Sequence, residues 1–126
     1  MTLLTGVLME TITYDPKPLT ANQLQRLSQE VKQALTELYG ERLDQVILYG
    51  SYARGDFHAE SDVNYLVVLR DEVVKHGGEI RFMGSHIGEL STNYDLFIAV
   101  KPVPMQKYRF SQLPFYQNVR REGIAL

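Results

Sequence analysis

The stretch VILYGSYARGDFHAESDVNYLVVL (residues 46–69) decides the fold, because it places two short apolar segments on either side of a polar loop. Val46–Tyr49 has the composition of a buried strand and runs directly into Gly50 and Ser51. A second strand is predicted over residues 62–69, and its nearly continuous apolar run is typical of a strand covered on both faces. The loop between Ser51 and Asp62 is ten residues long, 52–61.

A helix is predicted upstream of this stretch. Thr20 followed by Gln23 is a capping-box signature, and the helix it begins ends at Gly40. An apolar stripe at helical spacing joins the two ends and consists of Leu24, Leu27, Val31, Leu35 and Leu38. Further upstream, the β-prone residues 1–14 are interpreted as an added strand or an arm.

Downstream, a helix and a third strand are predicted. Residues 71–92 carry apolar side chains at helical spacing, although glycines weaken that helix. Tyr94–Val100 is the third predicted strand, closed by Pro102 and Pro104. Alternating helices and strands around one sheet predict an α/β (α+β) domain. We expect one domain over residues 1–126, with 1–18 as an N-terminal extension or arm and 101–126 as a tail that packs on the domain.

Composition and charge narrow the function classes. The 126 residues include 13 basic and 15 acidic side chains, so no global positive field draws this protein to nucleic acid or to an anionic membrane. The absence of cysteine excludes thiolate chemistry and agrees with a cytoplasmic location. The longest apolar runs have strand length and are too short to cross a bilayer. Any phosphate binding must therefore come from groups gathered at one site and not from the overall charge of the protein.

Polar side chains at the strand ends form the candidate site. Asp62 and Asn64 point to the same side of a strand because side chains alternate, and Asp95 joins them if the third strand lies alongside. Oxygen ligands side by side on a rigid sheet suit Mg²⁺ together with substrate phosphates. Gly50 lets a phosphate approach the backbone, and the Ser51 hydroxyl can hold phosphate oxygens.

The segment GSYARGDFHAESDVN (residues 50–64) resembles the Gly-Ser, ten residues, Asp-x-Asp signature of minimal nucleotidyltransferases (MNT proteins) of the polymerase-β-like superfamily. The resemblance extends over the whole chain in length and element order, and the closing FYQNVRREGIAL (115–126) is similar to the tails of that family. It implies a nucleotidyltransferase fold, a small mixed sheet flanked by helices, and transfer of a nucleoside monophosphate from a nucleoside triphosphate to an acceptor.

The resemblance also implies roles for individual residues. Gly50 and Ser51 would bind the triphosphate, Asp62 would bind metal, and Asp95 would be the third carboxylate, a metal ligand and candidate general base. The predicted catalytic and metal-binding set is therefore Asp62, Asn64 and Asp95. For Arg54 two interpretations stay open, a phosphate contact and a surface ion pair.

Cofactors and partners follow from the same resemblance. The implied cofactor is Mg²⁺, the substrate is ATP, and the implied partner is an HEPN-domain toxin that an MNT antitoxin neutralises by binding or by adenylylation. We accordingly expect a hetero-oligomer with no direct contact to nucleic acid. The alternatives are an active nucleotidyltransferase that acts on a small molecule or another protein, and a nucleotide-sensing module.

Asn64 departs from the family signature, which has a second aspartate at this position. An amide offers one neutral oxygen, so it cannot bridge two cations as a carboxylate does. Loss of one of three carboxylates is expected to lower a nucleotidyl-transfer rate by orders of magnitude. Three explanations stay open: a degenerate antitoxin that works by binding, an engineered knock-out, and slow activity with one metal.

The remaining conspicuous side chains have structural interpretations. We expect Phe110, Phe115 and Tyr116 to pack against the domain, while Arg120 and Arg121 are either solvated or part of a docking surface for an acidic partner. Asp56 is expected to cap or pair at the surface. The three histidines show no metal-ligand spacing and are His58, His76 and His86.

Overall fold

A computed structural model describes residues 16–126, so the prediction of a strand or arm over residues 1–14 lies outside the described chain. Helices and strands alternate along that chain. Their bounds are α2 (Ala21–Tyr39), the 3₁₀ turn η1 (Gly40–Arg42), β1 (Leu43–Tyr49), α3 (Ser51–Arg54), β2 (Val63–Leu69), α4 (His76–Tyr94), β3 (Ile98–Pro104), α5 (Met105–Phe110), α6 (Pro114–Glu122) and β4 (Ile124–Ala125).

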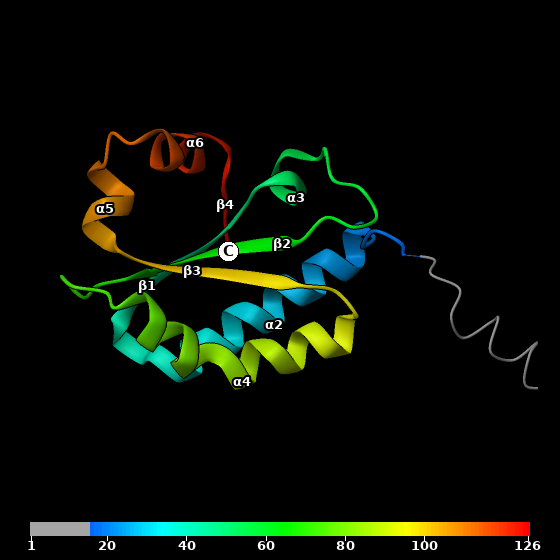
Figure 1. Cartoon of the computed structure of the whole chain (residues 1–126), viewed down its shortest axis with the longest axis horizontal. Coiled ribbons are helices and arrows are strands. Elements are labelled where there is room, and N and C mark those ends of the chain that lie inside the picture. The colour runs from blue at the N-terminus through cyan, green and yellow to red at the C-terminus, as the bar shows by residue number, and fades with distance from the viewer. Residues whose placement is uncertain (1–15) are drawn as a thin grey trace, which may run out of the picture.

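The strands form one mixed sheet in the order β3-β2-β1-β4 (Figure 1). β1 pairs antiparallel with β2 and with the short β4, whereas β2 and β3 are parallel. The long helix α4 makes the crossover that a parallel pair requires. The predicted α/β fold with a small mixed sheet flanked by helices is therefore confirmed.

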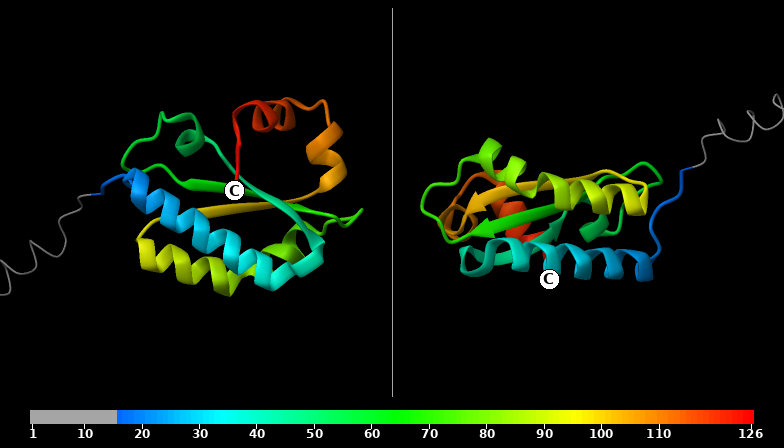
Figure 2. Two further views of the ribbon diagram at one scale, coloured as in Figure 1. Left: turned by 180° about the vertical axis from the view of Figure 1, so that it is seen from behind. Right: turned by 90° about the horizontal axis from the view of Figure 1, so that it is seen from below.

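Each face of the sheet buries its own apolar cluster. Successive residues of β2 alternate between them: Tyr65 and Val67 belong to the larger cluster, and Leu66 and Val68 to the smaller. The larger cluster lies under α2 and α4, and the smaller lies under α5 and α6, on the opposite side of the sheet (Figures 1 and 2). Every residue of β2 except Asn64 is buried, which explains the near-continuous apolar sequence of the strand.

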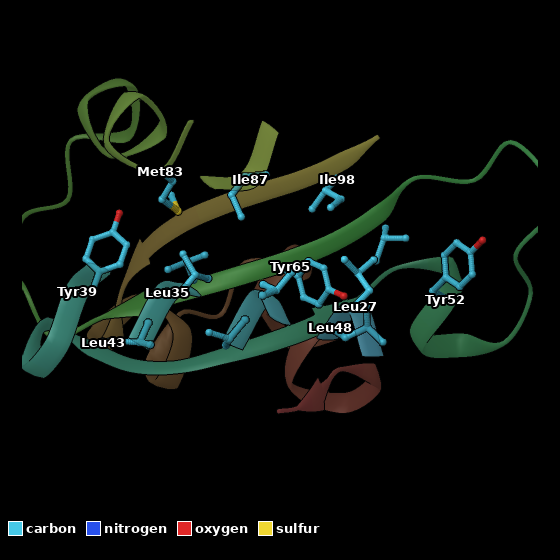
Figure 3. Packing of buried hydrophobic residues seen from close by; sticks show 14 of the residues in the cluster. Leu27, Leu35, Tyr39, Leu43, Leu48, Tyr52, Tyr65, Met83, Ile87 and Ile98 are labelled. Carbon is cyan, nitrogen blue, oxygen red and sulfur yellow. The ribbon is translucent and has the colours of Figure 1, made fainter. Parts of the chain in front are cut away.

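Helix α2 begins and ends where the sequence predicts. The Thr20 side chain accepts from the Gln23 backbone N–H at 3.1 Å, and the Gln23 side chain accepts from the Thr20 N–H at 2.8 Å. The helix ends at Gly40, whose positive φ of 57° a glycine adopts without strain. Between these ends, a buried hydrogen bond of 2.9 Å joins the Ser28 and Tyr65 hydroxyls across the larger cluster, in which Figure 3 shows Tyr65 beside Leu27.

The third strand starts later than predicted, and Asp95 is not part of it. Helix α4 continues to Tyr94, and Asp95 caps it in the left-handed conformation, with φ 53° and ψ 49°. The Asp95 backbone N–H donates to carbonyls in the last turn of the helix. Strand β3 begins only at Ile98 and includes Pro102 and Pro104, which an edge strand tolerates because half of its N–H groups have no ladder partner.

The C-terminal residues divide into buried and exposed side chains. Tyr116 and Val119 of α6 are buried in the smaller cluster, and Phe115 packs against it. Phe110 is 67% exposed, so the prediction that it packs in the core is wrong. Phe110 is the last residue of α5 and is not part of the smaller cluster, although α5 and α6 both lie on that face of the sheet (Figure 1).

The two arginines whose roles the sequence left open have different surroundings. Arg120 donates to the Tyr108 and Ser111 carbonyls at 2.7 and 2.6 Å and so ties α6 to the end of α5. The Arg121 side chain is 64% exposed, and its hydrogen bonds within the described chain go to its helix neighbours Asn118 and Glu122. Within residues 16–126, the longest helices lack the apolar length needed to span a bilayer.

Candidate functional site

The Gly50 turn and the polar start of β2 meet on the face of the sheet opposite α2 and α4. Tyr49 pairs with Asn64 in the antiparallel ladder, which brings the following turn against Asn64. A Cβ added to Gly50 would lie 2.7 Å from the Asn64 Nδ2, and the Gly50 φ of 83° is also one that other residues rarely adopt. Position 50 favours glycine mainly because of its backbone conformation, and a larger residue would in addition have to displace the Asn64 amide.

Tyr52 fixes the short helix that follows the turn. Its ring is buried, lies 4.3 Å from the Phe57 ring, and its hydroxyl accepts a hydrogen bond of 3.0 Å from the Leu19 backbone N–H. Because Leu19 directly precedes the cap of α2, this bond joins the start of α2 to α3. The Gly50-Ser51 turn is consequently held between a buried anchor at Tyr52 and the strand β1.

A small hollow of about 240 Å³ lies between α3 and α6. Its lining consists of Tyr49, Gly50, Arg54, Phe115, Asn118, Val119 and Glu122. Sequence reasoning did not assign the α6 residues to the site, although residues 115, 118, 119 and 122 have the spacing of a single helix face. Lys101 was also missed; its Nζ lies 5.1 Å from the centre of the Phe115 ring.

Arg54 lines this hollow and is already paired with carboxylates. Its guanidinium lies 3.1 Å from the Asp56 Oδ2 and 3.6 Å from the Glu122 Oε2. The hydrogen bond to Asp56 is the largest cause of a raised pKa at Arg54, so the group stays charged. Burial likewise raises the pKa of Tyr49 and keeps its hydroxyl neutral. The hollow therefore holds a paired cation and carboxylate, Arg54 and Glu122, beside aromatic rings.

A larger groove of about 1010 Å³ opens beyond the start of β2. Three of its walls are residues 16–19 ahead of α2, the loop 59–62, and residues 91–97 at the end of α4. Asp62 and Asp95 both line it and are exposed, whereas Ser51 and Asn64 line neither of the two hollows. The structure thus brings Asp62 and Asp95 into one groove, with Asn64 and Gly50 in contact next to it.

The strand neighbouring β2 carries no carboxylate beside Asn64. In the parallel register Asn64 pairs with Ala99, and Val63 pairs with Ile98. Among residues 16–126, no group of three or more acidic, histidine or cysteine side chains is arranged to hold a metal ion. The prediction that Asp95 lies within the third strand is wrong, because α4 continues to Tyr94, Asp95 caps that helix, and β3 begins only at Ile98. Its role as a third metal ligand stays a prediction.

Comparison with protein families and curated proteins gives consistent matches. The model of the family described as "Nucleotidyltransferase domain" matches residues 28–121. "Putative protein adenylyltransferase MJ0141" of Methanocaldococcus jannaschii is 33% identical over 98 residues, which cover 77% of this chain and 92% of that protein. "Putative protein adenylyltransferase MJ0604" of the same organism is 43% identical over 102 residues, with coverages of 77% and 91%.

Solved structures share the fold at low sequence identity. A chain from a toxin-antitoxin crystal structure with AMP-PNP superimposes with a TM-score of 0.55 at 18% identity, over 77% of this chain and 69% of that chain. A chain from the complex of the tri-AMPylated Shewanella oneidensis HEPN toxin with MNT antitoxin gives a TM-score of 0.52 at 16% identity, with coverages of 80% and 69%. At these identities the likeness establishes the fold.

Proposed function

The chain belongs to the nucleotidyltransferase domain family, and from that premise we propose that it is an MNT-type antitoxin that binds ATP and an HEPN-domain toxin. Nucleotidyl transfer by the protein as it stands is slow or absent, because the site has too few carboxylates. The single observation that carries this proposal is the contact between Gly50 and Asn64, which joins the phosphate-binding turn to the metal-binding position of the family signature.

Triphosphate binding is assigned to the turn between β1 and α3. The first amides of a helix have no acceptor within the helix, and Gly50 leaves the backbone there open to a phosphate oxygen. The Ser51 hydroxyl adds a donor at the same point. Lys101, over the Phe115 ring beside the hollow, adds positive charge on this face of the sheet. Arg54, in contrast, would have to leave its two carboxylate partners to contact a phosphate.

The available ligands suit one Mg²⁺ ion and not two. The Asp62 carboxylate and the Asn64 amide oxygen would hold a single ion that arrives with the triphosphate, since Mg²⁺ is commonly bound by one or two protein oxygens plus phosphates and water. When bound, that ion offsets phosphate charge and orients the triphosphate. A second ion needs a bridging carboxylate, which Asn64 and Ala99 do not provide.

Slow transfer follows from this shortage of charge. The attacking hydroxyl must lose a proton, and the transition state accumulates negative charge on the phosphate oxygens. Asp62 would bind the ion and Asp95, in the same groove, is the candidate general base, whereas Asn64 supplies no negative charge at the ion. Removing one charged group from such a site typically lowers the rate by two to three orders of magnitude.

The assignment of an HEPN partner rests on the similar proteins. Structures with this fold come from toxin-antitoxin complexes, one with an AMPylated HEPN toxin. The proposal is tested by co-expressing the tagged chain with a candidate HEPN-domain protein from the same organism. Size-exclusion chromatography and light scattering then show whether the two proteins form one complex. A stable hetero-oligomer is the expected result, and two separate peaks at micromolar concentrations would exclude this function.

A second candidate is supported by the two curated relatives, which are named protein adenylyltransferases. In this alternative the chain transfers AMP to a protein at a useful rate despite Asn64. The two candidates share the same nucleotide site and differ in rate, so a transfer assay separates them.

Calorimetry with Mg·ATP tests the nucleotide site directly. Ser51→Ala removes one donor to a charged phosphate and is expected to weaken binding roughly tenfold. Ser85→Ala on the exposed surface of α4 is the matched control, with wild-type affinity expected. Equal affinities for all three proteins would show that the turn at Gly50 and Ser51 does not bind phosphate.

A further inference from the structure

The segment that contains α5 and α6 carries a charge opposite to that of the rest of the chain. Residues 96–121 include five of the 13 basic side chains and none of the 15 acidic ones. The other residues therefore have eight basic against 15 acidic side chains. A local excess of positive charge in a net-negative protein attracts an acidic ligand to one surface, while the overall charge still disfavours polyanions.

Two large apolar side chains of this segment are exposed. Phe110 is 67% exposed and Leu113, three residues later, is 60% exposed. Met105 and Tyr108 pack against the smaller cluster, so the turn of the helix places Phe110 on the outer face of α5, next to Lys107. We define the α5 surface by its four residues, Lys107, Arg109, Phe110 and Leu113.

The turn between the two apolar side chains is held by hydrogen bonds at Ser111. Its carbonyl accepts from the Arg120 guanidinium at 2.6 Å, and its hydroxyl accepts from the Leu113 N–H at 3.2 Å. Its own N–H donates to the Lys107 carbonyl at 3.0 Å. A turn fixed in this way has little conformational freedom left to lose when a partner binds, which favours recognition at the α5 surface.

Positive charge at the α5 surface is only partly offset within the protein. The Asp44 carboxylate, which is 9% exposed, lies 3.3 Å from Arg109 and 3.6 Å from Arg70. One carboxylate is thus shared by two arginines whose side chains are about half exposed. Lys107 makes no ion pair with another residue of the described chain, 16–126. The excess charge therefore lies beside the exposed apolar side chains.

This combination fits an acidic protein segment better than nucleic acid or lipid. Nucleic-acid sites neutralise many phosphates and stack bases on aromatic rings, whereas this surface has few cations and an aliphatic side chain, Leu113. The apolar residues Tyr116 and Val119 are buried in the smaller cluster, so α6 has no free apolar face for a membrane. Exposed aromatic side chains together with arginine are typical of protein–protein contacts.

We propose that the α5 surface is the docking site for an acidic segment of a partner protein. Carboxylates of that segment pair with Lys107 and Arg109, while an apolar side chain of the segment packs on Phe110 and Leu113. None of these four residues lines the hollow at Gly50 or the groove beyond β2. The docking site is therefore separate from the proposed nucleotide site.

An NMR titration of the isotope-labelled full-length protein tests the docking site and locates it. The probe is a nine-residue peptide in which glutamate and alanine alternate around a central leucine, compared with the same peptide carrying glutamine in place of glutamate. We expect the glutamate peptide to shift the amide resonances of residues 105–113, with an affinity that falls as salt rises. The glutamine peptide should bind about tenfold more weakly. Absence of binding, or shifts centred elsewhere, would overturn the docking site.

Two double variants separate an effect of this surface from a general charge effect. Lys107→Gln together with Arg109→Gln should weaken the glutamate peptide about tenfold. Lys75→Gln together with Arg81→Gln removes the same charge from exposed residues at α4 and should leave peptide binding unchanged. Equal losses of affinity in the two double variants would refute specific docking at α5.

The apolar part of the site has its own matched pair of variants. Phe110→Ser keeps the charge and should weaken the glutamate peptide severalfold at all salt concentrations. Val73→Ser changes a side chain that is 74% exposed outside the α5 surface, and it should bind the peptide like the wild type. Wild-type affinity in Phe110→Ser would overturn the docking site. Tighter binding of single-stranded RNA or of phosphatidylserine vesicles than of the peptide would also overturn it, in favour of that ligand.

The nucleotide proposal and the docking site can fail independently. Phe110→Ser and Lys107→Gln should each bind Mg·ATP like the wild type. Peptide binding at the α5 surface of a protein that does not bind ATP would leave the docking site standing and remove the proposed function. ATP binding without any affinity for the glutamate peptide would do the reverse.

Discussion

Gly50 has a backbone that only glycine adopts easily and a neighbour, the Asn64 amide, that must shift to admit a side chain. Gly55 has almost the same φ, 86°, with open space around it. We predict that Gly50→Ala lowers the free energy of unfolding by roughly 2–4 kcal/mol, from backbone strain and the clash together, whereas Gly55→Ala lowers it by about 1 kcal/mol from strain alone. Urea denaturation of both variants measures the difference.

Equal losses in the two glycine variants would contradict the packing of Asn64 on Gly50. A second comparison isolates the clash, because Asn64→Ala should recover part of the loss in Gly50→Ala and none in Gly55→Ala. Loss of Mg·ATP binding in Gly50→Ala is also expected, since an added Cβ blocks the approach of a phosphate to the turn.

Tyr65 gives a prediction for alkaline pH. Burial raises the pKa of its hydroxyl to about 12, from an ordinary value near 10. Between these two values the unfolded chain loses the proton while the folded chain keeps it, so folding stability falls as pH rises. At pH 8 the Tyr65→Phe variant should be less stable to unfolding than the wild type by about 1 kcal/mol, because it loses the hydrogen bond to Ser28. Above pH 10 its free energy of unfolding should decline less steeply than that of the wild type. Parallel declines in urea titrations of the two proteins would refute this.

Side-chain alternation predicts Asp62 and Asn64 on one face, but β2 begins at Val63, so Asp62 lies just before the strand, and their shared face stays a prediction. Asp95 could not be placed in the same way. Its neighbours Leu96 to Val100 are apolar enough for a strand, yet the residue is at a left-handed helix end, a position that aspartate and asparagine tolerate better than most residues. The choice between helix cap and strand depends on tertiary packing of α4 that the local sequence does not specify.

At the scale of elements, Arg120 and Arg121 make a matched pair on α6. Arg120 donates to two backbone carbonyls at the end of α5 and just after it, whereas Arg121 is exposed. We predict that Arg120→Gln destabilises the protein by roughly 1–3 kcal/mol, while Arg121→Gln changes the stability by less than about 0.5 kcal/mol. Thermal unfolding by circular dichroism measures both, and a neutral Arg120→Gln would mean that α5 and α6 pack without this link.

Helix α2 shows which element boundaries the sequence can determine. Its capping box and its terminal glycine are local signals, and both ends were predicted correctly. Strand β3 lacks such signals, and the prolines that suggested its end lie inside it because it is the sheet's edge. Local chemistry therefore predicts the helix, while the register of the edge strand depends on pairing with β2.

At the scale of the whole molecule, α3 lies between two hollows of different chemistry. One is small and contains Arg54 and aromatic rings, and the other is large and acidic. The family signature and the alternation of elements sufficed to predict the fold, because they constrain the sheet and its crossover. The hollows were not predictable, since α6 and the segment ahead of α2 reach the site only through tertiary packing.

We propose above all that Asn64 limits nucleotidyl transfer in a site that otherwise binds ATP. The most direct measurement is the rate at which label from α-labelled ATP is transferred, with Mg²⁺, to the proposed HEPN-domain partner. The wild type and Asn64→Asp are compared at equal ATP occupancy. We predict transfer by Asn64→Asp that is at least about tenfold faster than transfer by the wild type, because a carboxylate restores charge at the ion. Equal, rapid transfer by both proteins would contradict the account.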